Sequence, residues 1–328
     1  MVNGLTSGQF MSGFVFLHIP KTAGTSFRTS LEVEFGRRRI CYDYSRDSRV
    51  TSRIVKKYHY DQRDECLFGI KFNKKKYSWL VGHFEIFRYI SIFKACMFLT
   101  FIRNPWDRMV SEYEHFVRDN GYKGSFIDVI GRSDFINRQS VMLANVPLQA
   151  IGFVGITELY ESELMSLERI YGLRIPVTRE NVSTDKSRVS FNRLDLDRHK
   201  AEFIELNKKD YVLYDLATLL SRQRSELLAG GKDVAHCAIS SCASGAIEGW
   251  AWFENDNTPP RVKVYINNVH VDTIESDVHM PGPSVFFPER RVIGFVSKAV
   301  FNEDDNVECF IEQNGQKLTR EYLINNEY

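Results

Sequence analysis

Short apolar runs alternate with helix-like segments over the first two thirds of the chain. Uninterrupted apolar runs occur at 14–17, 67–72, 79–81, 96–102 and 153–156. A run of this length without polar alternation is typical of a strand that is buried on both faces. Between the runs, apolar residues recur every three or four positions, which favours amphipathic helices. The pattern therefore predicts an α/β domain with a parallel sheet flanked by helices.

Two of the predicted helices begin directly after a predicted strand. After the run at 14–17, apolar positions recur four residues apart from Phe27 to Phe35, and Gly36 is a residue type that ends helices. After the run at 96–102, an Asn-Pro pair provides a helix cap and a first turn. Both segments are therefore predicted to form a unit of strand, loop and helix.

The pattern changes after the helical stretch at 195–228. Beyond it, the segments 262–271 and 307–323 each consist of two apolar stretches separated by a turn signal, Asn-Asn or Asn-Gly, so each predicts a hairpin. This tail is predicted to be all-β, in the form of a small sandwich. The predicted divisions are an α/β domain at 1–228, a linker at 229–236 and a β-sandwich domain at 237–328.

Charge is distributed unevenly along the chain. The whole chain has 43% apolar residues and a net charge of +1, as expected for an ordinary globular protein. Residues 1–120, however, contain 20 Lys or Arg and 12 Asp or Glu, a net charge of +8. The basic runs at 37–39 and 74–76 belong to this part, although each run alone is typical of a solvated face. A basic N-terminal third suits an anionic ligand.

No sequence feature indicates a membrane, a secretory route or a metal. No apolar stretch is long enough to span a bilayer, and residues 1–13 lack the basic and apolar segments of a signal peptide. The six cysteines show neither paired metal-ligand spacing nor the density of a disulfide scaffold. We therefore expect a cytoplasmic protein with no transmembrane segment, no bound metal and mostly reduced cysteines.

The loop after the first predicted strand has the composition of a phosphate-binding loop. Residues 18–26 read His-Ile-Pro-Lys-Thr-Ala-Gly-Thr-Ser. Backbone N–H groups at a helix start bind phosphates, Lys21 adds a positive charge, and Gly24 permits close approach of the ligand. Lys21 precedes Gly24 and no Gly-Lys-Ser/Thr end follows, so this is not a Walker A loop. ATP with magnesium is therefore disfavoured.

A second anion-binding element is predicted where the run at 96–102 meets its helix. Arg103 follows the strand, and Arg108 and Ser111 are three residues apart on the helix, so they share a face. Arginine together with a hydroxyl can bind a phosphate through charge-assisted hydrogen bonds. Two anion sites at neighbouring strand ends indicate a nucleotide with two separate phosphate groups.

Together these two motifs resemble the donor-binding elements of sulfotransferases that use 3′-phosphoadenosine 5′-phosphosulfate (PAPS). The similarity is greatest to the family of heparan-type 2-O-sulfotransferases and other carbohydrate sulfotransferases with a Pro-Lys-Thr-Ala-Gly-Thr-Ser loop. It extends over about 13–220 and includes matching segments at 82–84, 153–158 and 180–183. The resemblance implies a P-loop-like sheet. The chain lacks the membrane anchor of the Golgi members and has an added β tail, and in both respects it resembles a bacterial-type member.

The resemblance also implies a role for each matching residue. The first loop would hold the 5′-phosphosulfate and the second element the 3′-phosphate, while the segment 180–183 would border the nucleotide. The residues implied in nucleotide binding are Lys21, Thr22, Ala23, Gly24, Thr25, Ser26, Arg103, Ser111, Asn181 and Ser183.

Sulfuryl transfer requires a base for the acceptor hydroxyl and stabilisation of the leaving oxygen. His83 is the candidate base, because imidazole titrates near neutral pH and this residue follows a predicted strand end and matches the Gly-His position of the family. The alternative base is Glu85 or another carboxylate. Lys21 is placed to neutralise charge on the departing nucleotide, 3′-phosphoadenosine 5′-phosphate (PAP). The reaction requires no metal.

We therefore expect a PAPS-dependent sulfotransferase whose acceptor is a carbohydrate, and the basic runs at 37–39 and 74–76 suit an acidic one. No nucleic-acid partner is expected. One alternative is a P-loop nucleotide kinase or other phosphotransferase, which the missing Walker end disfavours. The other is a non-catalytic glycan-binding protein with a vestigial donor site, which the retained Lys21, His83 and Arg103 disfavour.

The tail contains a Gly-Trp-Ala-Trp segment at 249–252. It weakly resembles the β-sandwich modules with a Gly-Trp-Ala signature that are attached to some bacterial glycan-modifying enzymes. We expect one of Trp250 and Trp252 in the core and the other exposed. The alternatives for this domain are a plain structural role, glycan binding and oligomer formation.

Overall fold

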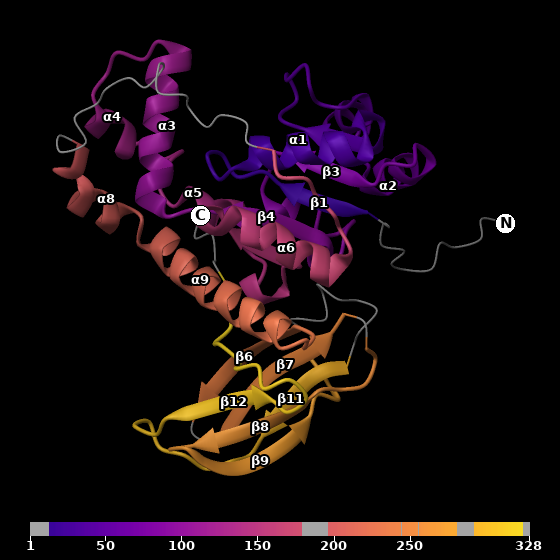
Figure 1. The fold of residues 1–328 in the computed structure, drawn as a ribbon, viewed down its shortest axis with the longest axis vertical. Helices are drawn as coiled ribbons and strands as arrows, with labels where there is room; N and C mark the ends of the chain where they lie inside the picture. The colour runs from indigo at the N-terminus through magenta and orange to yellow at the C-terminus, as the bar shows by residue number, and fades with distance from the viewer. Residues whose placement is uncertain (1–12, 179–195, 244, 255, 281–291, 324–328) are drawn as a thin grey trace.

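The computed structural model describes residues 13–178, 196–243, 245–254, 256–280 and 292–323, which form an α/β part and a β part. In Figure 1 the α/β part lies at the top and the β part at the bottom, with the long helix α9 (Lys208–Ala229) along their boundary.

A five-stranded parallel sheet forms the centre of the α/β part, in the order β2-β3-β1-β4-β5. Every residue of β3, β4 and β5 is buried, as expected for strands covered on both faces. The α/β prediction is therefore confirmed, and the carboxyl ends of β1, β3 and β4 lie side by side. The strands are β1 (Phe14–Leu17), β2 (Ile40–Asp43), β3 (Trp79–Gly82), β4 (Phe98–Ile102) and β5 (Phe153–Ile156).

Helices cover both faces of this sheet. One face packs against α1 and α6, and the other packs against α2 and α9. Alternate residues of each strand enter these two cores, so the whole width of the sheet is enclosed. The remaining elements include a seven-residue π-helix, η2. The helices are α1 (Gly24–Phe35), η2 (Val55–Asp61), α2 (Glu65–Lys74), α3 (Pro105–Asn120), α4 (Phe126–Ile130), α5 (Arg138–Met142), α6 (Tyr160–Tyr171) and α8 (Lys200–Leu206).

The predicted strand at 67–72 is wrong, because this run lies within helix α2. The side chain of Asp64 caps the first turn of that helix. Phe68 and Phe72, four residues apart, are fully buried, whereas Ile70 between them is half exposed. This is helical and not strand spacing. The short strand β2, which follows the arginine run at 37–39, was not predicted.

The β part consists of two antiparallel sheets that enclose their own core, which confirms the predicted all-β tail. Asn267 and Asn268 have φ values of 51° and 65°, which a two-residue type I′ hairpin requires. One sheet has the order β10-β11-β7-β6 and the other β12-β8-β9. The strands are β6 (Ala235–Ala243), β7 (Ala246–Phe253), β8 (Arg261–Ile266), β9 (Val269–Glu275), β10 (Val278–His279), β11 (Val292–Ser297) and β12 (Val307–Ile311).

The two parts share a hydrophobic core. Trp250 and Trp252 are 0% and 3% exposed and belong to the same cluster as Ile151 and Val154 of the α/β part. Residues two apart on a strand face the same side, so the expectation that one tryptophan is exposed is wrong. The indole of Trp250 also donates a hydrogen bond to Glu321 at 2.9 Å.

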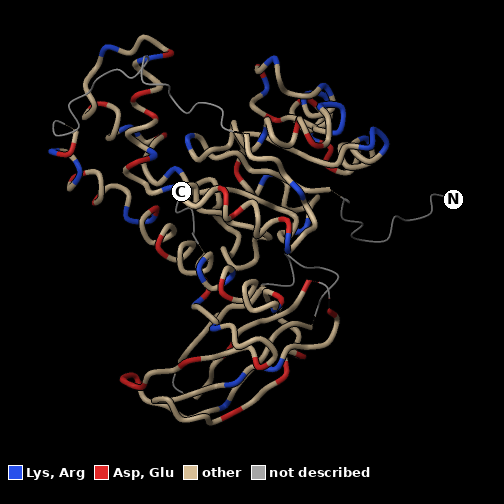
Figure 2. The backbone as a smooth tube through the Cα atoms, viewed as in Figure 1, with Lys and Arg blue, Asp and Glu red and all other residues tan. Residues whose placement is uncertain are grey.

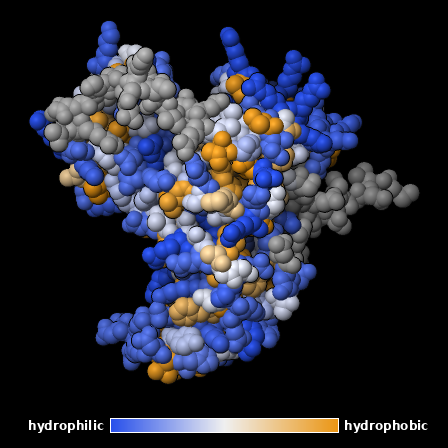
Figure 3. Space-filling view, viewed as in Figure 1, coloured by the Kyte–Doolittle hydropathy of each residue, from blue (hydrophilic) through white to orange (hydrophobic). Residues whose placement is uncertain are grey.

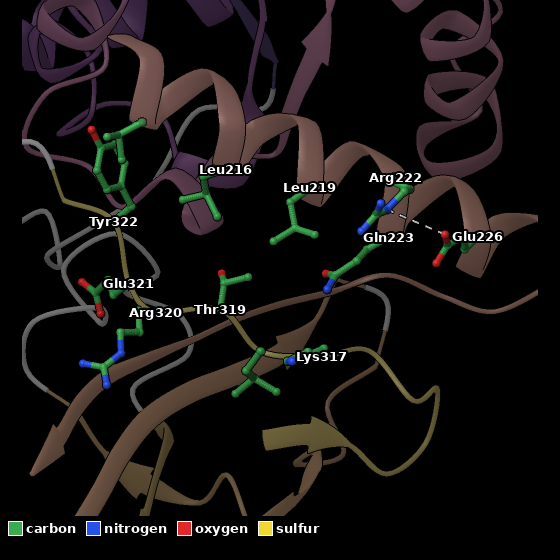
Figure 4. Close-up of a pocket in the computed structure, with 12 residues that line it drawn as sticks. Leu216, Leu219, Arg222, Gln223, Glu226, Lys317, Thr319, Arg320, Glu321 and Tyr322 are labelled. Atoms are coloured by element: carbon green, nitrogen blue, oxygen red, sulfur yellow. Dashed lines mark ion pairs between the residues drawn. The ribbon is translucent and has the colours of Figure 1, made fainter. Parts of the chain in front are cut away.

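The end of the described chain lies beside α9. The second predicted hairpin is right for β12 and for the turn at Gly315, where φ is 77°. Its other arm pairs only through single bridges, to β12 and to β6. Figure 4 shows this arm, residues 317–322, facing the leucines of α9 across a groove of about 630 Å³.

Candidate functional site

The loop between β1 and α1 has a tightly turned backbone. Lys21 and Ala23 adopt left-handed conformations with φ of 67° and 63°. Such conformations are uncommon for residues other than glycine and cluster at ligand sites. The first helical hydrogen bond runs from the N–H of Phe27 to the carbonyl of Ala23, so the N–H groups at the helix start have no helical acceptor. Backbone N–H groups at a helix start are a common site for anions.

Gly24 is required because His18 packs against it. A Cβ at this position would lie 1.9 Å from Cδ2 of His18. The His18 side chain is buried, and its Nδ1 lies 3.0 Å from the hydroxyl of Tyr44. Burial, together with neighbouring His83, lowers the pKa of His18 well below its ordinary value. The His18 ring is therefore uncharged and packs against the loop at Gly24.

The second element reaches the first one. Arg103 follows β4, and its Nη1 lies 3.4 Å from the carbonyl oxygen of Lys21. Asn104 begins α3 by accepting hydrogen bonds from the N–H groups of Trp106 and Asp107. The two predicted motifs are therefore in contact at neighbouring strand ends.

A set of buried side chains fixes the backbone of Arg103. Gln139 accepts a hydrogen bond from the N–H of Arg103 and donates one to its carbonyl, both at 2.9 Å. The carboxylate of Asp210 accepts from the N–H groups of Gln139 and Ser140, at 3.2 and 2.7 Å. Helix α9 thereby positions a residue of the site through α5.

Both motifs open into one cleft of about 800 Å³. Ala23, Gly24, Thr25 and Ser26 line it together with Lys21, Arg103 and Ser111. Thr22 is the exception within the loop, because its side chain is buried and donates to the carbonyl of Ile19 at 2.9 Å. The cleft lining that the sequence prediction missed consists of His18, Thr157, Glu158, Leu159, Tyr160, Glu161, Ser162, Met165 and Thr178.

Two of these missed residues hold the loops in place. Thr178 donates to the carbonyl of Ser26 at 2.9 Å, and Glu158 accepts from the N–H of Asn104 at 2.9 Å. Glu158 lies in the segment 153–158 that resembles the family, so a signal for it was present. Thr178 has no such signal.

Arg108 does not line the cleft. Its side chain is 1% exposed, and the nearest carboxylate is Glu112, at 3.6 Å. None of its three nitrogens has a hydrogen-bond partner among the described residues. Burial lowers the pKa of Arg108, and the carboxylates of Asp210 and Glu112 raise it. The expectation that Arg108 and Ser111 share a phosphate-binding face is therefore not met, and Ser111 alone of the two reaches the cleft.

His83 lies immediately behind His18, with ring centroids 4.3 Å apart. Its Nδ1 is 2.5 Å from the carbonyl oxygen of His18. Because a carbonyl oxygen only accepts, Nδ1 carries the proton, and Nε2 of the neutral ring has a free lone pair. Burial lowers the pKa of His83, its hydrogen bond to His18 raises it, and Arg138 and Arg28 lower it further. A neutral His83 ring therefore has one nitrogen that can accept a proton, but His83 is not among the residues that line the cleft.

The backbone around His83 depends on the absence of a side chain at Gly82. A Cβ there would lie 1.7 Å from the carbonyl oxygen of Asp43 at the end of β2. The N–H of His83 donates to the same oxygen at 2.9 Å. Glu85, the alternative base, has an exposed side chain.

Lys21 lies in a strongly charged environment. Burial lowers its pKa, the carboxylate of Glu112 raises it, and the charge of Arg103 lowers it. Asn181 and Ser183 lie outside the described residues. No cluster of potential metal ligands occurs in the described part of the chain, and none of the helices described there is long and apolar enough to cross a membrane.

A parallel α/β sheet with a loop and helix N-terminus after its central strand, and an arginine and a hydroxyl after the next strand, is an arrangement typical of domains that bind anionic ligands. A model of the sulfotransferase family matches residues 11–217, well over half of the chain. This chain therefore belongs to the sulfotransferase family. No curated protein sequence matches it closely enough to serve as a relative.

Proposed function

We propose that this sulfotransferase moves the sulfuryl group of PAPS to a hydroxyl of a carbohydrate and releases PAP. The observation that supports the donor is the single cleft that joins a helix N-terminus to Arg103 and Ser111. PAPS carries one anionic group at its 5′ side and another at its 3′ side, so it requires two such sites at once. An adenine nucleotide without a 3′-phosphate would leave one of them empty.

Each element has a distinct role in this proposal. The N–H groups at the start of α1, with Lys21, Thr25 and Ser26, bind the 5′-phosphosulfate. Arg103 and Ser111 bind the 3′-phosphate. The bonds from Gln139 fix the backbone of Arg103, and the carbonyl of Lys21 lies 3.4 Å from its Nη1, so part of the ordering of this residue precedes binding.

The reaction is an in-line displacement at sulfur. Nε2 of His83 takes the proton of the acceptor hydroxyl as the new oxygen–sulfur bond forms and the bond from sulfur to the PAP phosphate oxygen breaks. The carbonyl of His18 holds Nδ1–H throughout and stabilises the imidazolium that results. Lys21 and the helix N-terminus stabilise the charge that develops on the departing oxygen.

The two-phosphate prediction is tested by thermal unfolding with PAP and with 5′-AMP. PAP should raise the melting temperature clearly more than 5′-AMP at equal concentration, because only PAP occupies both anion sites. Equal shifts would contradict the donor assignment. Incubation with labelled PAPS and a panel of glycans, lipids and phenols then identifies the acceptor. Label on lipids or phenols alone would contradict the proposed carbohydrate acceptor.

A further inference from the structure

His18 is a buried polar residue in the lining of the cleft. It is 5% exposed and lines the cleft together with Lys21 and Gly24. A Cβ at Gly24 would lie 2.3 Å from Nε2 of this ring, so the Nε2 edge faces the loop between β1 and α1. Among the residues that the structure describes, none forms a hydrogen bond with Nε2. Buried polar groups normally have a partner, so this nitrogen suits a ligand in the cleft.

The hydroxyl of Tyr44 determines which nitrogen of His18 carries the proton. It lies 3.0 Å from Nδ1. Because burial lowers the pKa of His18 well below its ordinary value, the ring is neutral and only one nitrogen is protonated. If Nδ1 donated, the phenolic hydrogen would have no acceptor in the described part of the chain. Tyr44 therefore donates to Nδ1, and the nitrogen that faces the loop is an N–H donor.

Arg28 favours the same orientation of the phenolic hydrogen. Burial raises the pKa of Tyr44, so the phenol keeps its proton, and the charge of Arg28 lowers this pKa. The Cζ atom of Arg28 lies 5.6 Å from the centroid of the Tyr44 ring, and Nε of Arg28 pairs with Glu32 at 3.5 Å. A cation attracts the lone pairs of a hydroxyl oxygen and repels its hydrogen. The hydrogen is therefore directed toward His18.

The neutral state of His18 also suits the neighbouring His83. The ring centroids of the two histidines are 4.3 Å apart, and Tyr44 packs edge-on against His83 at 4.7 Å. A positive charge on His18 would oppose the imidazolium that His83 becomes when it takes a proton. An uncharged N–H can contact an anion without this repulsion.

Cations elsewhere in the α/β part attract anions over a longer range. The segment 37–76 contains 13 Lys or Arg and 5 Asp or Glu. In Figure 2 the blue segments gather at the upper right, and Figure 3 shows hydrophilic side chains projecting there. Such attraction brings an anion to the protein but does not fix its orientation, whereas a hydrogen bond has a preferred direction. An N–H donor in the wall of the cleft provides that direction.

We propose that His18 is a PAPS-binding residue, whose Nε2–H binds an anionic oxygen of the 5′-phosphosulfate, and that Tyr44 positions this proton. The proposal rests on the proposed function, because it assigns a further contact to the same ligand. The bond from His18 adds to those from Lys21 and from the N–H groups at the start of α1. Tyr44 does not line the cleft and acts only through His18.

The first test compares two replacements of His18 in the full chain. Gln places an amide N–H near the position of Nε2, whereas Asn places one near Nδ1. His18→Gln should keep the PAP affinity within about threefold, and His18→Asn should lower it about tenfold or more. Calorimetry measures the affinities for PAP, for 5′-AMP and for inorganic pyrophosphate, which mimics the linked anionic groups of the 5′-phosphosulfate. The melting temperature without ligand shows which variants are folded.

The second test addresses Tyr44 without changing His18. Tyr44→Phe should lower the PAP affinity about threefold or more, because the His18 proton can then occupy either nitrogen. Long-range proton–nitrogen NMR should show Nε2–H in the wild type and a mixture of both forms in Tyr44→Phe. A merely structural role of Tyr44 would not change this spectrum. The matched control Tyr322→Phe removes a hydroxyl that donates to the carbonyl of Lys209 at 3.1 Å and should leave the PAP affinity unchanged.

Several outcomes would overturn the proposal. They are a normal PAP affinity in His18→Asn, equal losses in both His18 variants, a wild-type ring protonated at Nδ1, and failure of all three probes to bind. If His18→Asn does not fold, the NMR spectrum and Tyr44→Phe still decide. PAP that binds no more tightly than 5′-AMP, with pyrophosphate binding that depends on His18, would refute the two-phosphate donor and leave the His18 site standing.

Discussion

The carboxyl edge of the parallel sheet and the β part use unusual backbone conformations for different purposes. In the β part, left-handed residues such as Asn267 and Asn268 form a hairpin turn, where asparagine is favoured. At the sheet edge they are Lys21 and Ala23, residue types that are disfavoured there, and they lie beside the buried His18. Strain and buried polar groups cost stability, so Lys21, Ala23 and His18 together mark a place where stability is given up, as is typical of ligand sites.

The largest expected effect is on stability and comes from the β part. Trp250→Ala should lower the free energy of unfolding by about 3–5 kcal/mol, because it removes a fully buried indole from the core that both parts share. The remaining folded protein should bind PAP normally. Urea unfolding and calorimetry measure the two quantities, with Val269→Ala on the exposed face of β9 as the control. Loss of PAP binding in the folded variant would show that the two regions are not separable.

His83→Ala should affect the chemical step far more than PAP binding. The transfer rate should fall about a hundredfold or more while the PAP affinity stays nearly unchanged, because the base acts only in the transition state. Lys21→Ala should lower both the transfer rate and the PAP affinity. Single-turnover transfer from labelled PAPS measures the rate, and Glu85→Gln is the control. A normal rate in His83→Ala with a dead Glu85→Gln would assign the base role to Glu85.

Arg103→Ala tests the second anion site. PAP binding should weaken by about 2 kcal/mol, because a charge-assisted contact is lost. Binding of 5′-AMP, which lacks the 3′-phosphate, should change little. Arg132, which pairs with Asp134 on the surface, provides the matched control Arg132→Ala. An equal loss for both nucleotides would place Arg103 at the 5′ side.

The smallest expected effect is a shift in pH dependence. His83 must be neutral to act as a base, and its pKa lies below the ordinary value of 6.5 because of burial. The rate should therefore be constant around neutral pH and fall only below pH 6.5. Arg138→Ala removes a cation that lowers this pKa, so the acidic limb should move to higher pH, by less than about one unit. A limb that moves to lower pH would contradict His83 as the titrating group.

The sequence predicted those elements whose signals are local. The strand and helix on either side of the first loop, and the turn at Asn267, each depend on a few adjacent residues. The strand prediction for 67–72 failed because a short apolar run is compatible with a strand and with a helix. Only the exposure of Ile70 distinguishes the two. The expectation for Trp250 and Trp252 failed for a different reason, because residues two apart on a strand share a face and both therefore enter the same core.

In the candidate site, too, the residues of local motifs were predicted and the contacts between distant segments were not. Seven of the residues that the motifs indicated line one cleft, since a motif places its own members. The supports of those residues come from far along the chain. Gln139 is 36 residues from Arg103, and Asp210 is 71 residues from Gln139. No pattern in either segment predicts these contacts, because they arise only when the sheet has formed.

The contact between Asp210 and the α5 backbone has a consequence for the order of events during synthesis. β1 pairs with β3 and β4, about 65 and 83 residues later, so closing the sheet requires long loops to be ordered first. Even when the sheet has closed, the contacts that hold the backbone of Arg103 through α5 are incomplete until Asp210 has left the ribosome. We therefore expect the cleft to be completed only when nearly the whole α/β part has emerged, which makes it a late product of folding.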